Sequence, residues 1–496
     1  MMKLAPVEGP LTSGPGGGRP SRRVGRTPLV FVVTALGAFM ASLDLSIVNV
    51  AFPALERSFS HASRPTLAWV ITAYGIVFAA LLVTAGRSAD RLGRRRVFFT
   101  GILVFSAGSA LCGLAPSVDL LIAGRVAQGA GAALLLPSSL GLLLEAFPAE
   151  KRSQTVALWG GVGALAVATG PSLGAALISA GGWRLAFYVN LPVAFVAWAV
   201  GRRVLVSDRP LTPAGHPDYA GVLLISGSLA GLVLAVSEGP DWGWPSWRVV
   251  AAGSLAVLLG LSFLRRCARH REPVLDLQLF RARSFSVANA AALVYSMGFF
   301  AMLLGNILFL TSVWHYSILK AGLAVTPGPI VVALVAGPAG KLATRVGFRP
   351  VIFTGSVLFA TGLAWYASVI GTTPEYLTQW LPGTLVVGLG IGLTFPVLSA
   401  AAVSSLPASR FAVGSAVNQT ARQVGGAVGV AVLVAILANP ASPQAALPHF
   451  QHLWVFSCAM AAAAGVISLL LRPARAEEGR QAPVKAMAIP AGATPE

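Results

Sequence analysis

The chain has 496 residues, of which 55% are hydrophobic and 11% are charged. Soluble domains carry about 25% charged residues, so this composition excludes an ordinary soluble protein. The net charge of +19 is high enough for a nucleic-acid-binding protein, but the arrangement of the basic residues argues against that class.

Apolar segments recur along the whole chain. A helix of about 20 apolar residues spans the roughly 30 Å of hydrocarbon in a bilayer, so we predict an all-α, polytopic membrane protein. The predicted spans are residues 30–54, 67–86, 97–115, 120–144, 155–180, 185–204, 219–237, 248–264, 285–314, 321–340, 351–370, 377–403, 413–438 and 452–471.

Basic residues alternate in number between the two sides of these fourteen spans. If both termini lie on one side, that side holds 29 Lys and Arg residues and the opposite loops hold 5. The remaining two, Arg125 and Arg422, lie within spans. This asymmetry is the positive-inside rule, so we expect both termini in the cytoplasm and no nucleic-acid partner.

The chain carries an internal repeat. Residues 86–95, after the second span, match residues 340–349, after the tenth span, at an offset of 254. In the fourth span Gly129-x-Gly131 precedes a proline by eight residues, and Gly388-x-Gly390 does the same in the twelfth, at an offset of 259. Two parallel repeats with substrate bound between them is a transporter architecture.

The repeat divides the chain into five regions. We expect six-helix halves at residues 28–205 and 285–471, separated by an inserted two-helix hairpin with flanking basic loops at 206–284. Residues 1–27 and 472–496 are polar and rich in Gly, Pro or Ala, so we expect disordered cytoplasmic tails there.

Asp44 is the only acidic residue near the middle of a predicted span. A bare charge at the bilayer centre costs several kcal/mol, so such a residue is paired, protonated or functional. Low-dielectric surroundings favour the protonated carboxyl, whereas a nearby guanidinium favours the ionised form. Asp44 is therefore our candidate proton carrier, and a purely structural, paired carboxylate is the alternative.

Arg125 lies about five residues inside the fourth span, deeper than a loop charge. Gln128 and Gly129 follow at i+3 and i+4 and share its helical face. We expect Arg125 to reach the pocket of Asp44 and to control its protonation. The alternative is that Arg125 snorkels to the outer headgroups.

The fifth span carries small residues on one face. Ala166, Gly170 and Gly174 are spaced at i, i+4 and i+8, and Gly163 precedes them. Small residues allow close backbone approach between helices, and Pro171 favours a bend. Ordinary helix packing is the alternative to a functional motif.

Polar side chains also lie in the thirteenth span. Asn418 and Arg422 are i, i+4 neighbours, and Arg422 is near the helix centre, so this face meets a cavity or a partner. With Asn49 and Gln128 they are our candidates for lining a substrate cavity. A lock between the two halves is the alternative for Arg422.

Together these patterns resemble the major facilitator superfamily, and within it the fourteen-span drug:proton antiporters. Residues 43–53 are similar to the first-span signature, with Ser46 in place of the usual Thr. Residues 86–95 resemble the loop between spans 2 and 3, with Ser88 in place of Leu, and residues 125–133 resemble the proton-transfer motif. The fifth span resembles the antiporter motif, with Ala166 and Ala175 replacing glycines.

The resemblance implies a major facilitator fold and a transporter that exports small amphiphilic molecules in exchange for protons by alternating access. It also implies a cytoplasmic latch that stabilises one conformation, formed by Gly86, Asp90, Arg91, Gly93, Arg94 and Arg95. We expect no cofactor other than the proton as coupling ion, no metal, and no enzymatic activity. The expected partners are a small amphiphilic substrate and the lipid bilayer of a bacterial inner membrane, with the monomer as the functional unit.

Other functions remain open at this point. They are export of one specific metabolite, import or facilitated diffusion and, more remotely, a non-transporting sensor or a membrane-embedded enzyme. A sensor favours long soluble domains, and an enzyme favours clustered titratable residues; the sequence shows neither. The charge of the substrate is also open, because the deep charges are one anion, Asp44, and two cations, Arg125 and Arg422.

Overall fold

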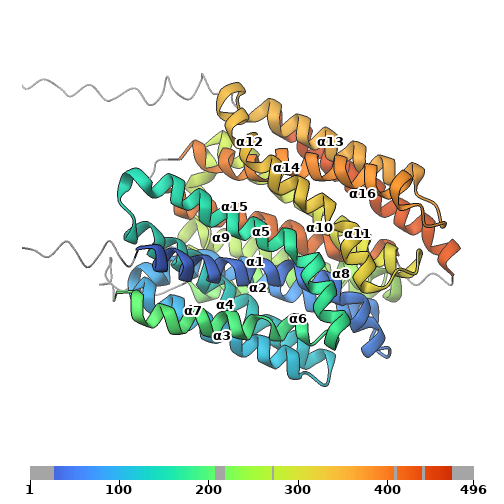
Figure 1. The fold of residues 1–496 in the computed structure, drawn as a ribbon, viewed down its shortest axis with the longest axis horizontal. Coiled ribbons are helices and arrows are strands. Elements are labelled where there is room, and N and C mark those ends of the chain that lie inside the picture. The colour runs from blue at the N-terminus through green and yellow to red at the C-terminus, as the bar shows by residue number, and fades with distance from the viewer. Residues whose placement is uncertain (1–26, 207–217, 271–272, 407–409, 438–441, 472–496) are drawn as a thin grey trace, which may run out of the picture.

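A computed structural model describes residues 27–206, 218–270, 273–406, 410–437 and 442–471 (Figure 1). Within these ranges the chain is helical, and 13 helices are long and apolar enough to cross a membrane, or 14 if the bent α5 is one span. The predicted all-α class and number of spans are confirmed. The predicted tails lie outside the described residues, apart from Thr27, which begins α1.

The helices follow the predicted order. They are α1 (Thr27–Ser58), α2 (Arg64–Leu92), α3 (Arg94–Leu114), α4 (Val118–Ala146), α5 (Ala149–Gly181), α6 (Leu185–Tyr188), α7 (Asn190–Val204), α8 (Tyr219–Trp242), α9 (Trp247–Arg269), the 3-10 helix η2 (Leu277–Arg281), α10 (Arg283–Ser312), α11 (Ile318–Val325), α12 (Pro327–Val346), α13 (Phe348–Val369), the π-helix η3 (Tyr376–Trp380), α14 (Leu381–Ser404), α15 (Phe411–Leu437) and α16 (Pro443–Ser468).

Several helices extend beyond their apolar segments because polar residues cap them. The Ser63 side chain accepts a hydrogen bond from the backbone N–H of Thr66 at the start of α2, and Ser117 does the same for Leu120 at the start of α4. Such a cap satisfies one of the free N–H groups of the first turn. The helices therefore begin a few residues before the spans predicted from hydropathy.

The internal repeat of the sequence is also a repeat of packing. A Cβ atom on Gly131 of α4 would collide with the backbone nitrogen of Phe105 on α3. A Cβ atom on Gly390 of α14 would collide with that of Phe359 on α13. The two phenylalanines are 254 residues apart and the two glycines 259, which are the offsets of the sequence repeat. Glycine is thus required at the same helix crossing in each half.

The turns at the second and tenth spans repeat as well. Gly93 separates α2 from α3 with φ 95°, and Gly347 separates α12 from α13 with φ 94°. Residues with side chains rarely adopt this conformation, so glycine permits the tight turn that the repeated motif requires.

The N-terminal helices, α1 to α7, meet the C-terminal helices, α10 to α16, along two main seams. At one seam α5 packs on α11, where Ser172 Oγ and Thr326 Oγ1 are 3.0 Å apart. A Cβ atom on Gly322 of α11 would lie 2.6 Å from the carbonyl oxygen of Pro171. At the other seam α2 packs on α15, and Thr420 donates a hydrogen bond of 3.1 Å to the carbonyl of Ala79.

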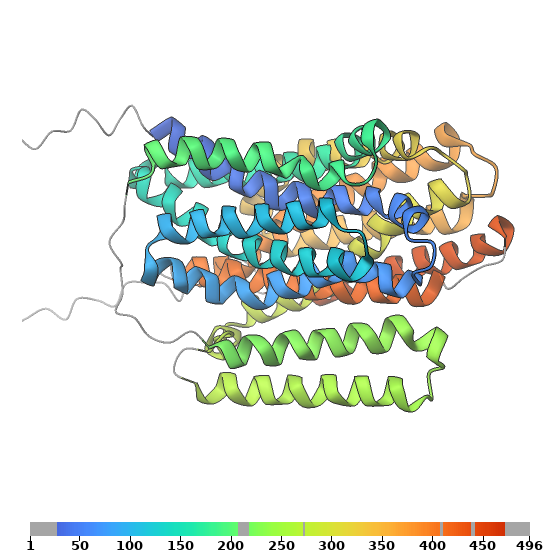
Figure 2. The ribbon, with the colours of Figure 1, turned by 90° about the horizontal axis from the view of Figure 1, so that it is seen from below.

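The helices α8 and α9 pair as a hairpin along one side of the bundle (Figure 2). The hairpin contacts both halves, because α8 packs on α2 and on α15. One buried cluster joins the three helices through Ile76, Leu229, Val233, Ala427 and Ala431. The hairpin therefore covers the seam between α2 and α15.

An ion pair ties the two helices of the hairpin together. Asp218 accepts hydrogen bonds from the backbone N–H of Gly221, capping α8, and from Arg266 Nε of α9 at 2.5 Å. Burial alone would raise the pKa of the Asp218 carboxyl, but the hydrogen bonds from Arg266 and Gly221 hold that pKa below its usual value.

The repeated glycine crossing leads to a first prediction. Gly131→Ala pushes α3 away from α4, and Gly390→Ala pushes α13 away from α14. Overpacking of this kind lowers the free energy of unfolding by about 1–3 kcal/mol. We expect both variants to unfold at a lower temperature than the parent in detergent. Gly75→Ala is the matched control, because a Cβ atom there meets nothing within 4 Å. Equal melting temperatures for all three variants would contradict the argument.

Candidate functional site

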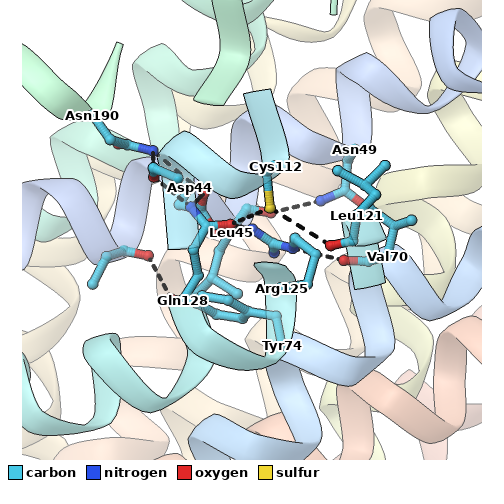
Figure 3. Close-up of polar contacts among 12 residues, drawn as sticks. Asp44, Leu45, Asn49, Val70, Tyr74, Cys112, Leu121, Arg125, Gln128 and Asn190 are labelled. Atoms are coloured by element: carbon cyan, nitrogen blue, oxygen red, sulfur yellow. Dashed lines mark hydrogen bonds and ion pairs between the residues drawn. The ribbon is translucent and has the colours of Figure 1, made fainter. Parts of the chain in front are cut away.

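The carboxylate of Asp44 lies at the centre of a polar network between helices of the N-terminal half (Figure 3). Asp44 on α1 and Arg125 on α4 form an ion pair, with 2.5 Å between Asp44 Oδ2 and Arg125 Nη1. Asp44 is 0% exposed and Arg125 is 1% exposed. The alternative in which Arg125 snorkels to the headgroups is therefore wrong, and Arg125 reaches the pocket of Asp44 as predicted.

Two amides complete the surroundings of the carboxylate. Gln128 Nε2 donates to Asp44 Oδ1 at 3.1 Å, and Asn190 Nδ2 of α7 donates to the same oxygen at 3.5 Å. Gln128 Oε1 accepts from Arg125 Nη1 at 2.8 Å, so this amide bridges the acid and the base. Ser109 Oγ of α3 accepts from both amides. Such a connected network determines the orientation of each of its members.

Contacts with α2 hold the Arg125 side chain on its other side. Arg125 Nε donates to the carbonyl oxygen of Val70 at 2.7 Å. The guanidinium carbon lies 4.4 Å from the ring centroid of Tyr74, a cation–π contact. The Tyr74 hydroxyl in turn donates to the carbonyl of Ala41. These three contacts together join α1, α2 and α4.

Glycines bring these helices close enough for the network to form. A Cβ atom on Gly129 would lie 2.7 Å from the carbonyl oxygen of Tyr74, and one on Gly108 would lie 2.7 Å from the backbone nitrogen of Gln128. Glycine at these two crossings lets α4 approach α2 and α3. The Gly129 that follows Gln128 in the motif is therefore part of the architecture of the site.

The Asp44 carboxyl is surrounded by hydrogen-bond donors. Every side chain that contacts its carboxylate donates a hydrogen bond, as expected for a group that only accepts. The pair with Arg125 makes the buried network neutral overall. Loss of the negative charge at Asp44 would leave the buried guanidinium without a counter-charge.

Three members of the network were not predicted from the sequence. Asn190 donates to Asp44 and to Ser109, Ser109 also accepts from Gln128, and Cys112 Sγ donates to Gln128 Oε1 at 3.4 Å. The available signal was a single amide in the predicted span 185–204 and small polar residues in the span 97–115. Isolated polar residues of this kind also occur in ordinary helix packing.

The helix α5 bends by 44° between Leu158–Val167 and Thr169–Gly181. Proline lacks the N–H that would bond to the carbonyl four residues earlier, so Pro171 leaves the carbonyl of Val167 without its helical donor. The hydroxyl of Ser46 on α1 donates to this carbonyl at 3.1 Å. Ser46 is the residue that replaces Thr in the first-span signature, and the retained hydroxyl explains why either residue fits.

The small residues of the predicted antiporter motif pack against α1. Added Cβ atoms on Gly163, Gly170 and Gly174 would meet, in order, the side chains of Ser42, Ser46 and Ile47. Pro171 faces α11 of the other half through its carbonyl oxygen. The motif thus links the helix of Asp44 to the seam between the halves.

The predicted latch residues lie around the turn between α2 and α3. Arg94 Nη2 pairs with Asp90 Oδ1 at 3.0 Å. Arg94 Nη1 donates to the carbonyl of Gly141 at 3.0 Å and lies 3.8 Å from Glu145 Oε2. Arg94 therefore joins the ends of α2, α3 and α4.

The other latch residues surround this contact. Gly86 packs on Pro137, Gly93 forms the turn, and Arg91 lies in the last turn of α2. The Arg95 guanidinium lies 5.5 Å from the ring centroid of Phe99. The role of this cluster in stabilising one conformation stays a prediction.

The candidate cavity residues differ in their exposure. Gln128 belongs to the buried network. Asn49 donates to the carbonyl of Leu45 on its own helix, and Asn418 donates to Asn289 Oδ1 of α10; both amides are buried. Arg422 alone among the four is partly exposed. Its contribution to a substrate cavity, like that of the others, stays a prediction.

The C-terminal half has a neutral counterpart of the site. The repeat offsets relate Cys112 to Tyr366 and Arg125 to Thr384. The Tyr366 hydroxyl and Thr384 Oγ1 are 2.7 Å apart, so a hydrogen bond occupies the position where the N-terminal half has charged groups. In the part of the chain that the structure describes, His, Cys, Asp and Glu form no group of three that could hold a metal ion.

Comparison with known proteins agrees with this geometry. The model of the Major Facilitator Superfamily matches residues 34–430 and 289–494. The multidrug resistance protein Stp of Mycobacterium tuberculosis is 34% identical over 79% of this chain and 73% of its own. The tetracenomycin C resistance and export protein of Streptomyces glaucescens is 31% identical over 80% of this chain and 73% of its own. The methylenomycin A resistance protein of Streptomyces coelicolor is 31% identical over 82% of this chain and 84% of its own.

A solved structure supports the fold. A bacterial homologue of the human drug peptide transporters PepT1 and PepT2 superimposes with a TM-score of 0.61 at 15% identity. The superposition covers 89% of this chain and 97% of that one. At this level of identity the likeness concerns the arrangement of the helices alone.

The buried ion pair predicts an asymmetric response to mutation. Breaking such a pair costs about 3–5 kcal/mol because it strands a buried charge. Arginine cannot lose its charge in a protein, whereas a carboxylate can bind a proton. We therefore expect Asp44→Asn to lower the melting temperature more than Arg125→Gln, and the double variant to recover part of the loss. Additive effects of the two substitutions would contradict this interpretation.

The contact between α1 and α5 predicts a coupling between two positions. Ser46→Ala leaves the Val167 carbonyl without its donor, which costs about 1–3 kcal/mol. In a Pro171→Ala background, the new backbone N–H takes over that hydrogen bond, so Ser46→Ala should cost less there. A double-mutant cycle on thermal unfolding measures the difference. Equal costs in the two backgrounds would show that the hydroxyl contributes nothing to this carbonyl.

Proposed function

We propose that the chain, which belongs to the Major Facilitator Superfamily, exports small amphiphilic drugs or antibiotics across a bacterial membrane in exchange for protons. Its relatives support export: they include a multidrug resistance protein, a tetracenomycin C export protein and a methylenomycin A resistance protein. We infer that the chain acts on molecules of this general kind as a transporter and not as an enzyme.

The observation that carries proton coupling is the buried pair of Asp44 and Arg125. Asp44 is a titratable group within a predicted span, and its counter-ion lies on a different helix. Because proton binding removes the charge that attracts Arg125, it changes the forces between α1 and α4. A change in the protonation of Asp44 is thus converted into a change in helix packing.

The proposed cycle uses this conversion twice. Asp44 binds a proton when the site faces outward, which weakens its hold on Arg125 and permits the halves to reorient. When the site faces inward, Asp44 releases its proton to the cytoplasm and pairs again with Arg125. The substrate then binds between the halves. The contact of Ser46 with α5 transmits the movement of α1 to the seam at Pro171, where the halves meet.

The available energy is sufficient for concentrative export. A gradient of one pH unit contributes about 1.4 kcal/mol, and 100 mV of membrane potential contributes about 2.3 kcal/mol per charge. Together they correspond to a concentration ratio of several hundred for one proton exchanged. No further energy source is needed in the proposal.

Two variants test the proton-coupling role. We expect Asp44→Asn and the double variant Asp44→Asn with Arg125→Gln to lose efflux driven by a pH gradient in proteoliposomes. Both should retain substrate counterflow, which needs no proton, provided that the folded fraction is isolated by size-exclusion chromatography. Asp119→Asn, an exposed carboxylate in the first turn of α4, is the matched control and should behave as the parent.

Full gradient-driven efflux by Asp44→Asn would remove Asp44 from the mechanism. Transport direction is measured in the same vesicles. Uptake that follows the proton into the vesicle would instead favour the alternative of an importer, and transport indifferent to the gradient would favour a facilitator.

A further inference from the structure

We propose that Arg422 and the aromatic side chains beside it bind the acidic group of the substrate, so that the preferred substrates are aromatic or conjugated acids. This inference rests on the proposed export function and names the chemical class of its substrate. It is carried by the charge, the exposure and the surroundings of Arg422.

Arg422 lies in the interior of α15, a candidate membrane span. Its Nε atom is buried without a hydrogen-bond partner, and no ion pair joins its guanidinium to any residue that the structure describes. Arginine stays charged in proteins, and an unpaired charge in a membrane protein requires a functional or structural reason. The guanidinium therefore has free donors for an anion.

The three deep charges are not equally available. Asp44 and Arg125 neutralise each other, and both are buried. Arg422 is partly exposed and lacks a counter-charge. In this conformation it is the only one of the three that a ligand can contact, so the accessible deep charge is positive.

Arg422 lies over an aromatic ring. Its guanidinium carbon lies 4.1 Å from the ring centroid of Phe395 on α14. Two further rings from α10, Tyr295 and Phe299, pack on Phe395 in T-shaped arrangements with centroid distances of 5.1 and 4.8 Å. Phe300 packs in turn on Phe299 at 5.1 Å.

This combination selects for a particular chemistry. A planar guanidinium donates two parallel hydrogen bonds to a carboxylate or a similar delocalised oxyanion. Of the adjoining rings, Phe299 and Phe300 are partly exposed and provide apolar, polarisable surface for an aromatic body. Arg422 holds its place through the Phe395 ring and not through a salt bridge, so its donors stay free for the ligand.

A lock between the halves is the competing role for Arg422. A lock requires a partner in the other half, and the described residues offer none to its guanidinium. The contact of this part of α15 with the N-terminal half is made by Thr420, which bonds to Ala79 of α2. The contacts of Arg422 favour a ligand over a lock.

Two xanthene dyes of the same ring system test the proposal. Fluorescein is anionic and rhodamine 123 is cationic at pH 7.5. Binding of each to the purified full chain in nanodiscs is measured by fluorescence anisotropy. We expect the parent protein to bind fluorescein more tightly, and Arg422→Gln to weaken fluorescein binding about 10-fold or more, as for loss of a charge-assisted hydrogen bond, without weakening rhodamine binding.

Two further variants test whether a loss of dye binding comes from a loss of folded structure. Arg422→Lys keeps the charge but not the planar fork, so it should bind fluorescein with intermediate affinity. Arg410→Gln removes an exposed positive charge just before α15 and should leave both affinities unchanged. Tighter binding of rhodamine than fluorescein by the parent protein, or equal loss of both dyes in Arg422→Gln, would overturn the proposal.

The measurement separates this proposal from that of proton-coupled export. Dye binding needs no gradient, so it reports on Arg422 even if efflux proves independent of the proton. Conversely, if Arg422→Gln binds fluorescein like the parent while gradient-driven efflux of either dye persists, the substrate class is wrong and the export function stands.

Discussion

The buried pair of Asp44 and Arg125 is the interaction on which the N-terminal half depends. Two charges removed from water are stable only when hydrogen bonds satisfy them from all sides. That requirement brings polar groups from α2, α3 and α7 to one point between α1 and α4. The glycines at the helix crossings follow from the same requirement, because the donors reach the pair only when the backbones lie close together.

Much of this organisation could be predicted from the sequence, since apolar segments, basic loops and repeated motifs each have a local pattern. The pairing of Asp44 with Arg125 was also predictable, because Asp44 is the only acidic residue near the middle of a predicted span and Arg125 lies too deep in the fourth span for a loop charge. The bond from Ser46 to Val167 was not. It depends on a carbonyl freed by Pro171 on a different helix, and no periodicity within α1 indicates which helix lies beside it.

The two halves share a fold but not their electrostatics. Their glycine crossings and turns repeat with constant offsets, whereas the charged network of one half corresponds to the Tyr366–Thr384 hydrogen bond in the other. Symmetric architecture suits a rocking motion of two similar bodies. The buried ion pair thus lies in one body, whereas the other holds Arg422, for which the described residues provide no ion-pair partner.

The position of the hairpin limits where molecules dissolved in the membrane can contact the bundle. Because α8 packs on both α2 and α15, the line where those helices meet is shielded from the acyl chains of the bilayer (Figure 2). The hairpin thus stands between the lipid and this line. The seam where α5 borders α11 and α12 has no such cover from α8 and α9.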